Sequence, residues 1–364
     1  MARLYSDFGL TTLDIQPESA FMKITRDLLF ELPKTDLHVH LDGSLRVKTA
    51  IELAKANDIP LPSHNEAEVR DFLSVKGQVE NLKTYLEKFD FTLKLMQNEE
   101  SLKRIAYELA EDAAQENITY MEVRYSPILH QQKGLSLEQV VDAVLEGLRE
   151  AEHKYPIRCG VIICGIRSID PATSVRLAEL TVAYKRKGVV AFDLAGGEYD
   201  NPAKDHAKAF YVVRKNCINC TVHAGEAYGP DSIHQAIHAL GAHRIGHGTR
   251  LIEDEDLLNY VCDHRIPLEI CLTSNVQTKT VLRIEHHPFK KYLDRQLRVT
   301  LNTDNRLISN TTMTDELWLA VQTWDLNFSQ VKKIILNGFK SLFIPFDEKA
   351  RIYNEAKARL SHFE

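Results

Sequence analysis

Two histidines stand two residues apart near the start of the chain, in the stretch KTDLHVHLDG that covers residues 34–43. Side chains two apart on a β-strand point to the same side, so His38 and His40 can share one cation if this stretch is a strand. Imidazole is a borderline ligand that suits Zn²⁺. The pair alone is weak evidence, because a single histidine is more often a structural core or loop residue.

Other polar side chains follow apolar runs farther along the chain. His223 is the penultimate residue of CTVHA and Glu226 comes three residues later, His247 ends HRIGH, and Asp304 follows LRVTLNT. His223 and Asp304 would complete a shell of three imidazoles and one carboxylate and leave a position for water. Four protein ligands are one more than the usual catalytic zinc site has, so a five-coordinate metal is expected. No lysine ends the fourth run to bridge two metals, and the residues therefore favour one metal.

These residues need a scaffold that brings distant segments to one place. Eight apolar runs with little alternation indicate buried strands, at residues 35–40, 118–125, 158–166, 188–196, 220–224, 243–248, 267–273 and 297–303. Helical periodicity lies between them, at residues 100–117, 136–155, 173–188, 232–242 and 253–265. Strands alternating with helices predict an α/β fold, a (β/α)8 TIM barrel, whose reactive groups gather at the carboxyl ends of the strands.

The positions of these strands and helices predict a single domain. Residues 1–364 form a single barrel domain, with 1–33 as an N-terminal extension and terminal helices from about residue 314. About eighty residues separate the first two strands, too many for one crossover helix. We therefore predict a helical insertion over one end of the barrel at 44–117.

Composition excludes several classes of protein. The chain is 44% hydrophobic and 26% charged with a net charge of −6, and it has no basic block that would indicate nucleic-acid binding. It has no apolar run long enough for a membrane span and no signal peptide. Six scattered cysteines are expected as reduced thiols. These features predict a soluble cytoplasmic protein, a monomer or weak homo-oligomer, with a small-molecule substrate.

Six motifs together resemble the adenosine deaminase family of the amidohydrolase superfamily. In chain order they are HVHLDG (38–43), MEVRYSP (121–127), FDLAGGE (192–198), HAGE (223–226), RIGHGT (244–249) and LNTDN (301–305). The resemblance spans nearly the whole chain. It implies zinc-dependent hydrolytic removal of the 6-amino group of adenosine, and of 2′-deoxyadenosine, to give inosine and ammonia in purine salvage.

The resemblance also implies a role for each polar residue. His38, His40, His223 and Asp304 would hold one zinc ion, and Asp304 would take a proton from the zinc-bound water. His247 would orient the hydroxide, and Glu226 would protonate the purine N1. We place Glu226 in the first turn of the next helix, whose dipole favours the anion. An apolar closed site would have to outweigh that dipole and raise the pKa of Glu226.

Substrate contacts follow from the same resemblance. Gly196 would offer a backbone N–H to purine N3, and Asp42 would reach ribose hydroxyls. A carboxylate there would repel a 5′-phosphate, and the related adenine deaminases show HLHLEG, so HVHLDG favours a nucleoside. Many family members have two aspartates and a proline where this chain has Asp304, Asn305 and Arg306. The NH₂ of Asn305 can still donate to N7, which only accepts.

One segment of the insertion has two interpretations. An apolar helix face with i, i+3, i+4, i+7 spacing is formed by Leu82, Tyr85, Leu86 and Phe89. These residues either pack in the core or form a lid over the substrate, as the corresponding family segment does. A lid would exclude water and favour a protonated Glu226.

Two other functions remain open. A sister deaminase would act on adenine or a modified adenosine, and an inactive barrel would serve as a nucleoside sensor. An inactive barrel is expected to have lost a ligand or the acid, whereas this chain retains all of them. The H-x-E and P-C-x-x-C signature of deaminases that act on nucleic acids is absent.

Overall fold

The computed structural model describes residues 23–363 and has a barrel at its centre. Each of its eight parallel strands pairs with the next in sequence. The strands are β1 (Lys34–His40), β2 (Ile118–Tyr125), β3 (Arg158–Ile166), β4 (Val189–Ala195), β5 (Asn219–Ala224), β6 (Arg244–His247), β7 (Leu268–Ile270) and β8 (Val299–Leu301). Beyond β8, Asp304 N donates to His38 O at 2.8 Å and His40 N donates to Asp304 O at 2.7 Å. These bonds join the last strand to the first and confirm the predicted TIM barrel.

All eight predicted strands occur, and β2 and β3 have the predicted bounds. The last three strands are shorter than predicted. The apolar run at 267–273 continues past β7 because its final residues already belong to the short helix α12 (Leu272–Gln277). An apolar run marks burial, but it does not tell a strand from the helix that follows it.

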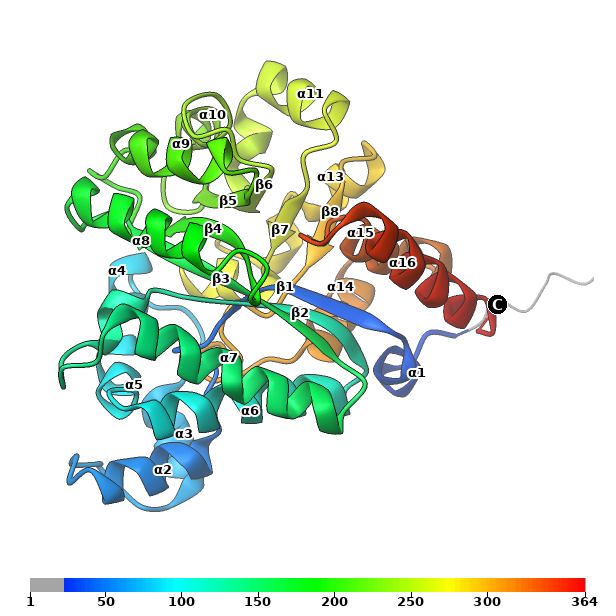
Figure 1. Cartoon of the computed structure of the whole chain (residues 1–364). Coiled ribbons are helices and arrows are strands. Elements are labelled where there is room, and N and C mark those ends of the chain that lie inside the picture. The colour runs from blue at the N-terminus through cyan, green and yellow to red at the C-terminus, as the bar shows by residue number, and fades with distance from the viewer. Residues whose placement is uncertain (1–22, 364) are drawn as a thin grey trace, which may run out of the picture.

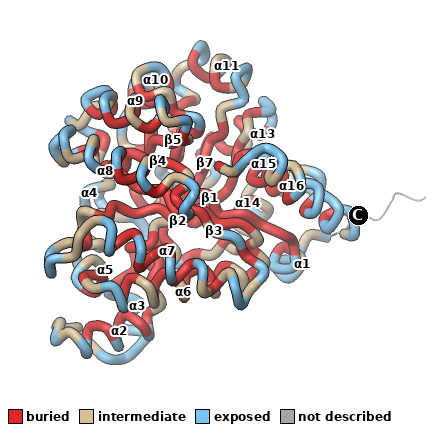
Figure 2. Tube along the Cα trace, viewed as in Figure 1, coloured by how far each residue is buried: buried red, intermediate tan, exposed pale blue. Residues whose placement is uncertain are grey.

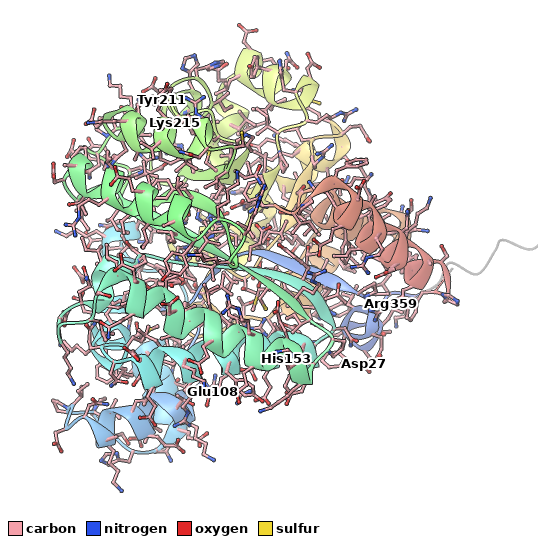
Figure 3. All side chains as sticks on the ribbon, viewed as in Figure 1. Asp27, Glu108, His153, Tyr211, Lys215 and Arg359 are labelled. Carbon is pink, nitrogen blue, oxygen red and sulfur yellow. The ribbon has the colours of Figure 1, made fainter. Side chains whose placement is uncertain are left out.

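An outer layer of helices surrounds the strands (Figure 1). It comprises α6 (Glu99–Gln115), α7 (Leu137–Lys154), α8 (Pro171–Ala183), α9 (Ala207–Lys215), α10 (Pro230–His238), α11 (Glu255–Asp263), α13 (Phe289–Asp294), α14 (Met313–Trp324), α15 (Phe328–Lys340) and α16 (Phe346–Ser361). The five predicted helices are among them, and α9 is an addition between β4 and β5. The outer faces of these helices carry polar and charged side chains. On α9, for example, Lys215 Nζ lies 5.7 Å from the centre of the exposed Tyr211 ring (Figure 3).

The segment between β1 and β2 contains four helices before the crossover helix α6. These are α2 (Val47–Ala56), α3 (Glu66–Leu73), α4 (Leu82–Leu86) and α5 (Phe89–Leu95). They lie at one side of the barrel, as the blue and cyan ribbons in Figure 1 show. The sequence predicted a single helix face over residues 82–89. In the structure this segment is divided between α4 and α5, and residues 87–88 lie between the two helices.

The N-terminal extension is described only in part. Residues 1–22 of the predicted segment lie outside the described residues. Next comes α1 (Arg26–Glu31), in which Arg26 Nη2 lies 2.8 Å from Asp315 Oδ1 at the start of α14. This contact joins the described part of the extension to the terminal helices.

The strands are buried on both faces, as the red tube at the centre of Figure 2 shows. Val, Ile and Leu fill most of these positions, which is expected of a parallel sheet covered by helices. The barrel interior also holds a charged layer, in which Arg124, Arg244 and Glu269 are at most 1% exposed. Within residues 23–363, no helix combines the length and apolarity that crossing a bilayer requires.

Candidate active site

The four predicted metal ligands meet at one end of the barrel. One donor atom from each of His38, His40, His223 and Asp304 lies within 4.8 Å of the others. His40 Nε2 and His223 Nε2 are 3.1 Å apart, and Asp304 Oδ1 lies 3.5 Å from His38 Nε2 and 3.4 Å from His40 Nε2. Their positions follow from the fold, since β1, β5 and β8 deliver their carboxyl ends to the same mouth.

The donor set fits a divalent cation. His38 Nε2 is buried without a hydrogen-bond partner among the described residues, which is unusual for a polar atom. Burial lowers the pKa of His40 well below its usual value and also lowers the pKa of His223, so both rings favour the neutral form that binds metal. Burial raises the pKa of Asp304, but His38 and other site histidines oppose it and bring that pKa well below the usual value.

Carboxylates behind the rings fix how two of the ligands face the centre. His38 Nδ1 donates to Glu269 Oε2 at 2.8 Å, and His223 Nδ1 donates to Asp193 Oδ2 at 3.0 Å. Arg124 joins the two carboxylates, with Nη2 2.9 Å from Glu269 and Nη1 3.0 Å from Asp193. Each bond leaves a bare Nε2 lone pair pointing inward.

Sequence reasoning did not identify this supporting layer. The sequence signal for this layer is a charged residue within a strand of mostly apolar residues. Arg124 lies in β2, Asp193 in β4 and Glu269 in β7. Such charges are almost never fully buried without partners. A charge in a buried strand therefore predicts a partner across the barrel interior.

Glu226 enters the same mouth but does not lie in a helix. The prediction of a first-turn position is wrong, because α10 begins at Pro230 and residues 225–229 form a loop. The helix dipole therefore does not act on the carboxyl group as expected. Burial, followed by the charges of Asp304 and Glu198, raises the pKa of Glu226 well above its usual value. Glu226 is thus suited to hold a proton near neutral pH.

His247 lies next to Glu226, with Nε2 3.5 Å from Glu226 Oε2. Asn275 Nδ2 donates to His247 Nδ1 at 3.1 Å, an assignment that leaves the ring proton on Nε2. His247 has a φ of 61° and Asp304 a φ of 59°, both in the left-handed region that side chains disfavour. Strained backbone of this kind gathers at functional sites.

The proposed substrate residues line the same region. Asp42 is buried, its Oδ1 has no hydrogen-bond partner among the described residues, and burial raises its pKa to about 7. Gly196 follows β4 directly with a φ of 95°, a conformation that glycine adopts readily. Asn305 packs against Gly43, where an added Cβ would lie 1.8 Å from Asn305 Oδ1.

The insertion reaches the site through α4 and α5. Asn305 Nδ2 donates to Tyr85 Oη at 3.0 Å, and Tyr85 Oη lies 2.6 Å from Ser309 Oγ. The Phe89 ring centroid is 6.4 Å from that of His40. Leu82 packs with Tyr85 and Phe89 in a small apolar cluster apart from the main core, whereas Leu86 is half-buried outside that cluster. The lid interpretation remains a prediction.

Several known proteins are similar in sequence to most of this chain. A family model described as adenosine deaminase matches residues 33–359. An adenosine deaminase of Clostridium kluyveri is 40% identical over 333 residues, which are 92% of this chain and 96% of that protein. A probable adenosine deaminase of Dictyostelium discoideum is 41% identical over 334 residues, and this chain spans 43% of its length.

A solved structure agrees with the fold. The N6-mAMP deaminase of Arabidopsis superposes with a TM-score of 0.82 at 27% identity, over 91% of this chain and 99% of that chain. The likeness therefore extends over the barrel and the segment inserted between its first two strands.

Proposed function

The chain belongs to the adenosine deaminase family, and we propose that it converts adenosine and water to inosine and ammonia. The observation that carries the proposal is one cluster in the barrel mouth. It combines three histidines and an aspartate that fit a metal with a buried Glu226 beside His247, and burial raises the pKa of Glu226 well above its usual value. Hydrolysis at an amidine carbon needs a nucleophile and an acid together, and this cluster supplies both.

We assign the metal as one zinc ion held by His38, His40, His223 and Asp304. The donors are nitrogen and carboxylate oxygen, which zinc accepts, and no cysteine is among the four. When bound, zinc supplies hydroxide near neutral pH by lowering the pKa of water. Metal analysis of the purified protein tests the assignment, with one zinc per chain as the expected result.

The side chains around the cluster divide the proton transfers. The carboxylate of Asp304 accepts a proton from the attacking water, and His247 Nε2–H donates to the water oxygen. Attack at C6 moves electron density to purine N1, which takes a proton from the carboxyl of Glu226. Asp304 passes its proton to the 6-amino group, which leaves as ammonia, and loss of the C6 hydroxyl proton to solvent gives inosine. Glu226 takes up a proton from solvent, so the atoms of adenosine and water balance.

Substrate contacts rest on the same proposal. Gly196 N–H donates to N3, Asn305 donates to N7, and Asp42 accepts from ribose hydroxyls. The segment with Leu82, Tyr85, Leu86 and Phe89 covers the substrate. We therefore expect adenosine and 2′-deoxyadenosine to be better substrates than adenine or AMP.

A second activity has one observation in its favour. The Arabidopsis relative acts on N6-mAMP, a modified adenosine nucleotide, and shares this fold at 27% identity. Comparing kcat/KM for adenosine, 2′-deoxyadenosine, adenine, AMP and N6-methyl-AMP decides between the two. Preference for adenosine supports the main proposal, and preference for a nucleotide or a free base contradicts it.

We further propose a role in purine salvage in the cytoplasm, as a monomer or weak homo-oligomer. A nucleoside is the kind of substrate that salvage recovers, and neither nucleic acid nor a membrane enters the proposed reaction. Light scattering over a range of concentrations tests the oligomeric state, and a stable large assembly would contradict it.

A further inference from the structure

A buried carboxylate outside the proposed chemistry binds the loop that carries Glu226. Glu198 lies in the loop after β4 and is 4% exposed. It accepts hydrogen bonds from four consecutive backbone N–H groups, at 2.8 Å from Gly225, 3.0 Å from Glu226, 2.6 Å from Ala227 and 2.7 Å from Tyr228. Ser232 Oγ donates a fifth at 2.8 Å.

This arrangement is not a helix cap. The helix α10 begins at Pro230, with Gly229 as the capping residue, so the four donors precede it. They curl around one anion as a backbone nest. Gly225 allows the curl with a φ of 70°, and an added Cβ there would lie 2.4 Å from Ile233 Cδ1. The conformation of this loop therefore depends on the anion that it encloses.

Arg167 extends the contact to the metal ligands. Arg167 Nη2 donates to the backbone carbonyl of His223 at 2.7 Å and lies 3.9 Å from Glu198 Oε1. Both side chains are 1% exposed. The carboxylate is thus held next to a cation, and the same cation binds the backbone of His223, near the end of β5.

Glu198 also joins two parts of the proposed purine site. It lies two residues after Gly196, the proposed partner of N3, and it binds the backbone N–H of Glu226, the proposed donor to N1. N1 and N3 are separated by one carbon in the purine ring. A single carboxylate therefore fixes the spacing between the loops that address these two atoms.

We propose that Glu198 is a positioning residue that sets the geometry of proton donation by Glu226. The inference rests on the proposed function, since it concerns the acid of that reaction. A displacement of about 1 Å in a catalytic group can cost about 100-fold in rate. Four backbone N–H groups of the loop that carries Glu226 end on this one carboxylate, so a change at Glu198 acts on the position of the acid. The negative charge of Glu198 also contributes to keeping Glu226 protonated.

Glu198→Gln tests the inference. The amide has the shape of the carboxylate but turns an NH₂ group toward the N–H donors of the loop. We expect kcat for adenosine to fall by about 10- to 100-fold while KM changes by less than about 3-fold. Zinc content should stay at the wild-type value. The matched control is Glu355→Gln, which removes an exposed carboxylate on α16 and should leave kcat and KM unchanged.

A double variant separates positioning from general structural damage. If Glu198 acts through Glu226, adding Glu198→Gln to Glu226→Gln should lower kcat by less than about 2-fold further. Independent damage would instead multiply the two losses. Wild-type kcat in Glu198→Gln, or multiplied losses in the double variant, would overturn the inference.

Ser232→Ala provides a second test that a folding failure of Glu198→Gln cannot remove. It deletes the one side-chain donor to Glu198 and keeps the four backbone bonds. We expect kcat to fall by about 2- to 5-fold at an unchanged KM, from the loss of about 0.5–1 kcal/mol. An unchanged kcat contradicts the inference. Failure of the zinc-loaded wild-type protein to deaminate adenosine would instead refute the proposed function.

Discussion

Arg124→Met is expected to damage both the stability of the barrel and its hold on zinc. Arg124 is fully buried and donates to Asp193 at 3.0 Å, Glu269 at 2.9 Å and the backbone carbonyl of Leu37 at 2.6 Å. Methionine fills much of the same space but offers no cation and no donor. Glu269 keeps Arg244 as a partner, whereas Asp193 is left with His223, one backbone N–H and the weak thiol donor of Cys164.

The magnitude follows from the burial of these charges. Removing one partner from a buried pair costs about 3–5 kcal/mol, because the other charge stays buried. Unfolding entropy is about 2.1 cal/mol/K per residue near 60 °C, or about 0.8 kcal/mol/K for this chain. A loss of about 4 kcal/mol therefore lowers Tm by about 5 °C. Loosening the carboxylates behind His38 and His223 should also weaken zinc binding by about 10- to 100-fold.

Calorimetry of the zinc-saturated protein measures the first effect, and chelator competition measures the second. Arg351→Met is the control, since Arg351 lies in an exposed pair with Glu355 and such pairs contribute little. The control should keep Tm within about 1 °C and the wild-type zinc affinity. If Arg124→Met matches the control in both measurements, Arg124 does not support the metal ligands as argued.

Three further outcomes are expected. Glu226→Gln should lower kcat by about 10²- to 10⁴-fold in a steady-state assay. Burial raises the pKa of Glu226, so the kcat/KM of the wild-type enzyme should be retained below that pKa and lost as the pH rises through it. A kcat/KM that rises over the same pH range contradicts an acid role. Chelation should abolish turnover and zinc should restore it at one ion per chain, whereas activity in metal-free protein excludes the assigned centre. Tyr85→Phe removes the oxygen that accepts a hydrogen bond from Asn305. Loss of this bond, worth about 1 kcal/mol, should raise KM for adenosine by about 5-fold. A loss confined to kcat contradicts a binding role.

The barrel was predictable because its strands carry their own signal. Runs of Val and Ile buried on both faces stand out from the helical periodicity around them, and turn residues separate the two. The helix α9 was missed, although α10 is equally short and also lacks a side-chain cap. Pro230 marks the start of α10, whereas neither a proline nor a capping side chain marks the start of α9. Short helices of this kind owe their stability to packing, which local sequence does not show.

The candidate site likewise has parts that the sequence predicts and parts that it does not. Positions at strand ends follow from the barrel rule, so His38, His223 and Asp304 could be brought together before any coordinates. The loop position of Glu226 was also readable, since Gly229 and Pro230 mark the start of the next helix. The contact of this loop with Glu198 was not, because that carboxylate comes from another strand end. Glu269 was missed for a similar reason, since its partners Arg124 and Arg244 lie 145 and 25 residues away in the chain.

The left-handed backbone at His247 and Asp304 has a consequence for engineering this protein. Glycine relieves such a conformation, which costs about 1–3 kcal/mol with an ordinary side chain. A design that scores backbone strain alone would therefore favour glycine at both positions and remove two side chains that the proposed chemistry needs. Variant libraries should hold both positions fixed, and hyperstable variants that change either one should be assayed for turnover before further use.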